Sequence, residues 1–203
     1  MPSSAKTASK VGLCIECGGK IAQILVSLGS LTCQVASFLP DGRRILIVAN
    51  APNRAARLYV MEATGGEPKP ITPEGVSLLL ANSTRHVSPD GRWVAAIGAD
   101  GRARLYPIEG GEPRDIPWLS AGELVIRWTP DGRALYVYKP QIRTRVEIVD
   151  LATGRRTVWR DLAPADPAGV NVISSVLIAP DGKSYVYSYS RLIEDLYLAE
   201  GLK

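Results

Sequence analysis

A three-residue phrase, Pro-Asp-Gly, occurs four times in this chain and constrains its fold more than any other feature. In such a turn proline fixes φ at the second position, aspartate suits the third, and glycine takes the positive φ that a hairpin bulge requires. Successive aspartates lie 49, 41 and 50 residues apart, which indicates an internal repeat. The turn residues are Pro40, Asp41 and Gly42; Pro89, Asp90 and Gly91; Pro130, Asp131 and Gly132; and Pro180, Asp181 and Gly182.

The repeat extends well beyond the turn. Each glycine is followed by Arg or Lys and then by a short β-rich run, and a third strand is expected at 57–63, 104–110, 146–152 and 195–201. A Gly-containing turn and a fourth short strand follow in the first three copies. Four antiparallel strands in roughly 40 to 50 residues are typical of a propeller blade. We therefore predict an all-β chain, a complete or partial β-propeller of about four blades at 30–76, 77–120, 121–165 and 166–203, after a poorly specified leader at 1–29.

The apolar residues of the repeat are expected to form the core. Phe38, Trp128 and Ile178 each stand two residues before a proline and should face the sheet interior. A Leu-Tyr pair recurs in the third strand and is interpreted as packing between neighbouring blades or at their edges rather than as a ligand cage. These pairs are Leu58 and Tyr59, Leu105 and Tyr106, and Leu196 and Tyr197.

Charge and cysteine content favour no nucleic-acid or metal site. The net charge is +4, but the basic residues are scattered singly, which is typical of a solvated rim, so no nucleic-acid partner is expected. Cys14, Cys17 and Cys33 are too few for a four-ligand zinc site, and His86, a packed or surface side chain, lies far from them. They are interpreted as ordinary thiols, with a disulfide as the alternative in an oxidising compartment.

The run 21–40 is uncharged and raises the question of a membrane span or signal peptide. It contains several polar residues, and its end already forms the strand that leads into the first turn. The leader is therefore interpreted as a separate segment, with a membrane span or a cleaved signal as alternatives.

The repeat "PDGRR…LYVMEATGGEPKPIT" resembles the TolB-like, WD-repeat-like β-propeller family. From about residue 35 onward, "VSPDGRWVAA", "RWTPDGRALYVY" and "YSYSRLIEDLYLAEGLK" resemble more closely the C-terminal propeller of large bacterial serine/threonine protein kinases. That resemblance implies a sensory or protein-binding module and favours an extracytoplasmic or periplasmic location. The kinase domain itself is absent from this sequence.

No motif for covalent chemistry is found. Phe38 lies between Ser37 and Leu39, and His86 precedes Val87, so neither the magnesium-binding nor the catalytic-loop motif of a kinase exists here. No Gly-x-Ser-x-Gly elbow is present for a serine hydrolase. Glu147 and Asp150 recur with the strand pattern and are interpreted as solvated strand ends. The chain is thus predicted to have no catalytic residue, no cofactor and no metal, and not to be an enzyme.

The remaining hypothesis is a non-catalytic binding module whose partner is a protein or a small ligand. Its candidate contact loops are 49–57 and 161–171. A TolB-like periplasmic interaction protein, or the accessory propeller of a peptidase, remains as an alternative. The fourth blade lacks its outer strand, so either segment 22–28 supplies it or an open edge remains through which the chain self-associates.

Overall fold

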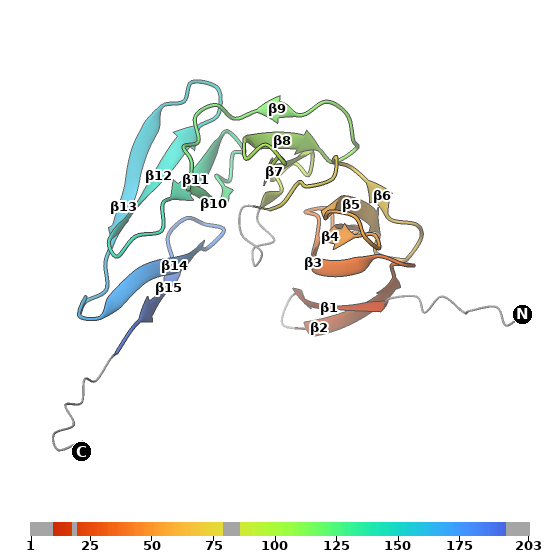
Figure 1. The fold of residues 1–203 in the computed structure, drawn as a ribbon, viewed down its shortest axis with the longest axis horizontal. Helices are drawn as coiled ribbons and strands as arrows, with labels where there is room; N and C mark the ends of the chain where they lie inside the picture. Colours follow the sequence, from red (N-terminus) through yellow and green to blue (C-terminus); the bar gives the residue numbers. More distant parts are fainter. Residues whose placement is uncertain (1–9, 18–19, 79–85, 194–203) are drawn as a thin grey trace, which may run out of the picture.

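The computed structural model describes residues 10–17, 20–78 and 86–193, with side-chain detail from residue 28 onward. It is all-β, as predicted, and its antiparallel sheets follow one another around an open arc (Figure 1). Within the described residues no helix is long and apolar enough to cross a membrane. The uncharged run 21–40 instead contributes to two β-strands, β2 (Lys20–Ser27) and β3 (Thr32–Phe38).

The first and third sheets have the four strands that the repeat predicts. The first contains β3 (Thr32–Phe38), β4 (Arg44–Asn50), β5 (Arg57–Glu62) and β6 (Lys69–Pro70). The third contains β10 (Leu124–Trp128), β11 (Ala134–Tyr138), β12 (Thr144–Asp150) and β13 (Arg156–Leu162).

The second and fourth sheets have fewer described strands than four. The second contains β7 (Trp93–Ile97), β8 (Ala103–Pro107) and β9 (Arg114–Asp115). Beside β7, the described residues form two isolated bridges, Ser77 to Ile97 and Val87 to Val94. The fourth contains β14 (Val170–Ile178) and β15 (Tyr185–Arg191). Its expected third strand at 195–201, with Leu196 and Tyr197, lies outside the described residues.

Part of the leader forms a hairpin of its own. β1 (Lys10–Cys17) pairs with β2 (Lys20–Ser27) in a two-stranded sheet, and β1 contacts β3 of the first sheet. The idea that segment 22–28 completes the fourth sheet is therefore wrong, because β2 pairs with β1 at the opposite end of the arc (Figure 1).

The second strands of the first and third sheets, β4 and β11, carry buried apolar residues on both faces, because side chains pack against each face of the sheet. In β4, Ile45 and Ile47 pack on one side with Leu28, while Leu46 and Val48 pack against the second sheet. In β11, Leu135 packs toward the second sheet and Tyr136 toward the fourth. Such strands read as continuous apolar runs rather than alternating ones.

The aromatic and Leu-Tyr positions mostly lie in these inter-sheet clusters. Trp128, Ile178, Leu58, Tyr59 and Tyr106 are buried, and Leu105 and Phe38 are half-buried against the same clusters. Trp128 also donates its indole N–H to the carbonyl of His86, over 2.7 Å, and so ties the third sheet to the segment that precedes β7.

The four Pro-Asp-Gly turns share one geometry. The glycine N–H of each donates to the carbonyl of the residue before proline over 2.8 to 2.9 Å, and the aspartate Oδ1 accepts the N–H of the following Arg or Lys. All four glycines have φ between 66° and 70°. A Cβ added to Gly91 would lie 3.8 Å from Cδ of Pro40, and one added to Gly132 would lie 3.6 Å from Cδ of Pro89. The first three turns therefore sit in a row along one rim of the arc.

Candidate binding pocket between the second and third sheets

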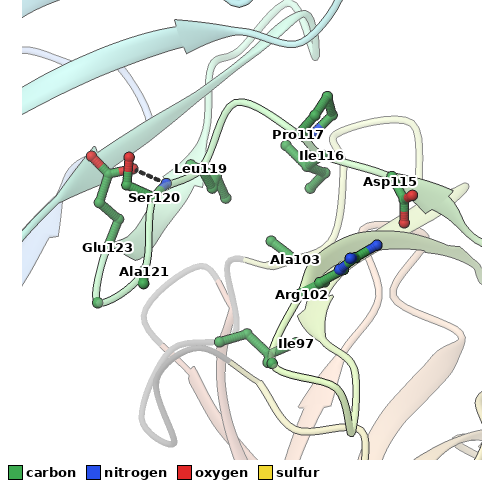
Figure 2. Close-up of a pocket in the computed structure, with 12 residues that line it drawn as sticks. Ile97, Arg102, Ala103, Asp115, Ile116, Pro117, Leu119, Ser120, Ala121 and Glu123 are labelled. Atoms are coloured by element: carbon green, nitrogen blue, oxygen red, sulfur yellow. Dashed lines mark hydrogen bonds between the residues drawn. The ribbon is translucent and has the colours of Figure 1, made fainter.

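A pocket of about 380 Å³ lies between the second and third sheets (Figure 2). The end of β7 and the β7–β8 turn form one wall, and the long connection from β9 to β10 forms the other. Its size falls within the range of roughly 300–1,000 Å³ that is typical of ligand sites. The lining side chains are mainly apolar: Ile97, Ala103, Ile116, Pro117, Leu119 and Ala121.

The wall formed by residues 118–123 is held by an ion-pair network. The guanidinium of Arg156 donates to both carboxylate oxygens of Glu123, over 2.8 and 2.7 Å, and to Glu147 over 2.6 Å. It also donates to the carbonyl of Trp118, and Glu123 accepts the N–H of Ser120 over 2.7 Å. These hydrogen bonds to Glu123 and Glu147 raise the pKa of Arg156. Because the Glu123 side chain is only 12% exposed, the network fixes the wall before any ligand arrives.

Besides Glu123, two charged residues line the pocket, Asp115 and Arg102, and they differ in how firmly they are paired. Asp115 accepts a hydrogen bond from Nε of Arg104 over 2.9 Å, and Arg104 also forms a bidentate pair with Asp100. Arg102 lies 4.0 Å from Asp100, and its side chain is 74% exposed. Arg102 is thus the cation that a negatively charged ligand group can approach without breaking a close ion pair.

The residues singled out in the sequence lie elsewhere. The Pro-Asp-Gly turns form the rim described above, and the loops at 49–57 and 161–171 contribute nothing to this pocket. Loop 49–57 is tied instead to residues 72–75, through Arg54 with Glu74 and the N–H of Gly75 with the carbonyl of Ala56. Glu147 takes part in the Arg156 network, and Asp150 caps the turn that follows β12.

Cys33 and His86, the cysteine and the histidine whose side chains the structure describes, belong to no metal-ligand cluster of described residues. Cys33 is a half-buried free thiol whose pKa is raised by burial, and the side chains of Cys14 and Cys17 lie outside the described detail. His86 is buried. Among the described residues no three His, Cys, Asp or Glu side chains are grouped as metal ligands would be.

The pocket itself was not visible in the sequence. Its residues come from the end of β9 and the connection that follows it, at 115–123, and from the end of β7, the turn after it and the start of β8. The one available signal was the departure of "DIPWLSAGE" from the repeat pattern.

The fold matches solved β-propellers. TolB from Acinetobacter baumannii gives a TM-score of 0.54 at 18% identity, over 85% of this chain and 46% of that one. A structure from a study of two prolyl endopeptidases gives 0.51 at 19% identity, over 80% of this chain and 26% of that one. The periplasmic gluconolactonase of Pseudomonas aeruginosa gives 0.51 at 16% identity, over 92% of this chain and 59% of that one.

These similarities show the fold alone, because all three identities are below 20%. This chain spans about half the length of the TolB chain that it matches. No protein-family model matches the sequence. No curated protein matches it either. The chain therefore has a propeller-type fold that resembles TolB and the propeller of prolyl endopeptidases, and a link to kinases is not shown.

Proposed function

We propose that this chain is a non-catalytic binding module of TolB-like propeller type. Its ligand has an apolar part and an acidic group, and it binds in the pocket between the second and third sheets. One combination of features supports the proposal. The pocket has a mainly apolar lining, Arg156 holds one of its walls through hydrogen bonds, and Arg102, which also lines the pocket, is only loosely paired. An apolar cavity with a few fixed polar groups is the usual form of a ligand site.

The test uses small carboxylates as probes. Hexanoate and phenylacetate are titrated into the labelled protein, and backbone amide shifts are followed by NMR. We expect shifts centred on Ile97, Ala103, Ile116 and Ala121. Ala121→Trp should abolish them, because the exposed alanine lines the pocket and an indole would fill it. Arg102→Glu should weaken binding by roughly tenfold or more, because it places like charges together.

Matched controls test the two alternative loops. Ala55→Trp and Ala168→Trp introduce the same side chain at exposed alanines in loops 49–57 and 161–171. Both variants should bind the probes as the wild type does. Probe binding that survives Ala121→Trp would end the proposal for the pocket. Binding that is lost only in Ala55→Trp or only in Ala168→Trp would also end it, and would place the site in the loop that carries the substitution.

A second candidate is the accessory propeller of a peptidase. The observation in its favour is the match to the prolyl endopeptidase structure, of which this chain covers 26%. The kinase-associated module suggested by the sequence resemblance is a third reading. Reading the genomic DNA on both sides of the coding sequence separates them, because an in-frame hydrolase or kinase domain identifies its own class. For the TolB-type reading we propose an extracytoplasmic location, which cell fractionation tests.

A further inference from the structure

A second cavity, of about 650 Å³, lies between the second and third sheets at the rim that carries the Pro-Asp-Gly turns. It shares only Asp115 and Ile116 with the pocket of the proposed function. Its volume falls within the range of roughly 300–1,000 Å³ that is typical of ligand sites. We call this cavity the rim groove, and its walls include Asp90, Trp93, Arg114, Arg133, Asp150 and Ala152.

The repeat provides an equivalent groove for comparison, of about 450 Å³, between the first and second sheets. Trp93 begins β7 as Arg44 begins β4, and Ala152 lies two residues after β12 as Glu109 lies two residues after β8. In the first groove the guanidinium of Arg44 donates to Asp41 over 2.7 Å and to Glu109 over 2.5 Å, so an ion pair bridges that groove. An indole and a methyl group form no ion pair, so the rim groove has no such bridge.

Arg114 and Arg133 supply the rim groove with two cationic donors. The guanidinium of Arg114 lies 4.3 Å from the centroid of the Trp93 ring, and Arg133 is exposed in the turn of the third sheet. Neither guanidinium forms a hydrogen bond or a close ion pair with a described residue. Stacking on the indole holds the plane of the Arg114 guanidinium and leaves its N–H groups available to a ligand oxygen.

Three carboxylates supply the groove with acceptors. Oδ1 of Asp90 and Oδ1 of Asp150 accept hydrogen bonds within their own turns, and Oδ1 of Asp115 accepts one from Arg104. Within the part of the chain that the structure describes, no donor reaches Oδ2 of these three aspartates. A carboxylate oxygen that carries no hydrogen bond accepts readily from a hydroxyl group. The groove therefore offers donors and acceptors together.

This combination selects the chemistry of the ligand. A strongly anionic ligand would meet the carboxylates, and a purely apolar one would leave charged groups desolvated without partners. A hydroxyl group both donates and accepts, so it satisfies guanidinium and carboxylate alike. Leu105, Ile116 and Leu151 also line the groove and offer apolar surface to the C–H groups of a ring.

We propose that the rim groove is a binding site for a neutral sugar ring. Its hydroxyl oxygens accept hydrogen bonds from Arg114 and Arg133, and its hydroxyl hydrogens are donated to Asp90 and Asp150. This site is separate from the pocket of the proposed function, so its test and the test of that function fail separately.

The probes are methyl β-D-glucopyranoside, methyl β-D-galactopyranoside and methyl α-D-mannopyranoside, in which the methyl group keeps the ring closed. Each is titrated into the labelled full chain and followed by NMR. At least one should shift the indole N–H signal of Trp93 and the amide signals of Gly132 and Ala152, and leave Ile97 and Ala121 unchanged. Hexanoate, the probe of the other pocket, should leave the three groove signals unchanged.

The first pair of variants fills the groove. Ala152→Trp places an indole at an exposed position in its wall and should abolish the shifts caused by the sugar. Ala168→Trp places the same side chain at an exposed alanine outside the groove and should bind the sugar as the wild type does. Binding of hexanoate to the other pocket should be unchanged in both variants, which shows that they are folded.

The second pair of variants removes a donor. Arg114→Gln should lower the affinity for the sugar roughly tenfold, because it removes a charged hydrogen-bond donor. Lys69→Gln is the matched control, since Lys69 pairs with Val60 in the first sheet as Arg114 pairs with Leu105 in the second. It should leave the affinity unchanged.

The proposal is overturned if none of the three sugars shifts the groove signals, or if hexanoate shifts them instead. It is also overturned if sugar binding survives Ala152→Trp, or if Arg114→Gln weakens it no more than Lys69→Gln does. Loss of hexanoate binding at Ile97 and Ala121, with sugar binding intact, counts against the proposed function alone.

Discussion

Thr129, the residue before the third Pro-Asp-Gly, has a hydroxyl group that stabilises the turn through two hydrogen bonds. Its Oγ1 donates to Oδ1 of Asp131 over 2.6 Å and accepts the N–H of Ala134 over 3.0 Å. The hydroxyl of Ser88 bonds to Asp90 in the same way in the second copy, and these bonds lower the pKa of both aspartates. Leu39 and Ala179 occupy this position in the first and fourth copies, so those turns lack the contact.

We predict that Thr129→Val lowers the free energy of unfolding by about 1–2 kcal/mol. Valine keeps the shape of the buried side chain but leaves the Ala134 N–H and the Asp131 carboxylate without this partner. Chemical denaturation followed by tryptophan fluorescence measures the loss. Thr157→Val, at an exposed position on β13, is the control and should change stability by no more than about 0.5 kcal/mol. Equal effects of the two substitutions would show that the hydroxyl of Thr129 contributes nothing.

At the scale of elements, Trp118 joins the β9–β10 connection to the turn after β12. Its indole N–H donates to the carbonyl of Leu151 over 3.2 Å, and its ring lies over Gly154. A Cβ on Gly154 would come within 2.4 Å of the ring. The glycine is needed here for space as well as for its φ of 73°. This contact holds the pocket wall at Trp118, the same residue whose carbonyl accepts a hydrogen bond from Arg156.

We predict that Gly154→Ala destabilises the protein more than Gly101→Ala. Both glycines have similar positive φ, 73° and 77°, so both variants carry the same conformational cost of about 1 kcal/mol. A Cβ added at Gly101 would have no heavy atom within 4 Å, whereas a Cβ added at Gly154 would have to displace the ring of Trp118. The difference in denaturation midpoint, together with the emission of Trp118, measures the packing contribution. Equal midpoints and unchanged emission would mean that the ring moves away without cost.

The strands were predictable wherever turn chemistry repeats, because Pro, Asp and Gly each have a conformational reason to occupy their places. The hairpin β1–β2 was not predictable in the same way, since residues 18–19 lack that phrase and the apolar run 21–28 fits several structures. The pocket was missed for a related reason. Its wall depends on the hydrogen bonds from Arg156 to Glu123, 33 residues away, and on the packing of Trp118 against Gly154. Contacts between residues so far apart in the chain leave no local sequence pattern.

For the whole molecule, the two ends of the arc differ. At the C-terminal end Val186 and Leu177 are exposed on the fourth sheet. At the N-terminal end the equivalent outer face of the first sheet is closed, because Ile45, Ile47 and Ala49 are completely buried. The hairpin β1–β2 lies at this end, beside the first sheet (Figure 1). The hairpin therefore lies beside the first sheet at one end of the stack, whereas among the described residues at the other end Leu177 and Val186 are exposed.

This difference predicts the effect of shortening the chain. Removing residues 1–27 should expose Ile45 and Ile47, and burial of one such side chain is worth about 1.5–3 kcal/mol, so stability should fall by about 3 kcal/mol or more. The shortened protein should bind more of a hydrophobic dye than the full chain does, because it exposes a further apolar face. Removing residues 1–9 keeps the hairpin and is the control, with unchanged stability. If both deletions denature at the same midpoint as the full chain, the burial of Ile45 and Ile47 does not depend on the hairpin, and Leu28 with its neighbours covers that face alone.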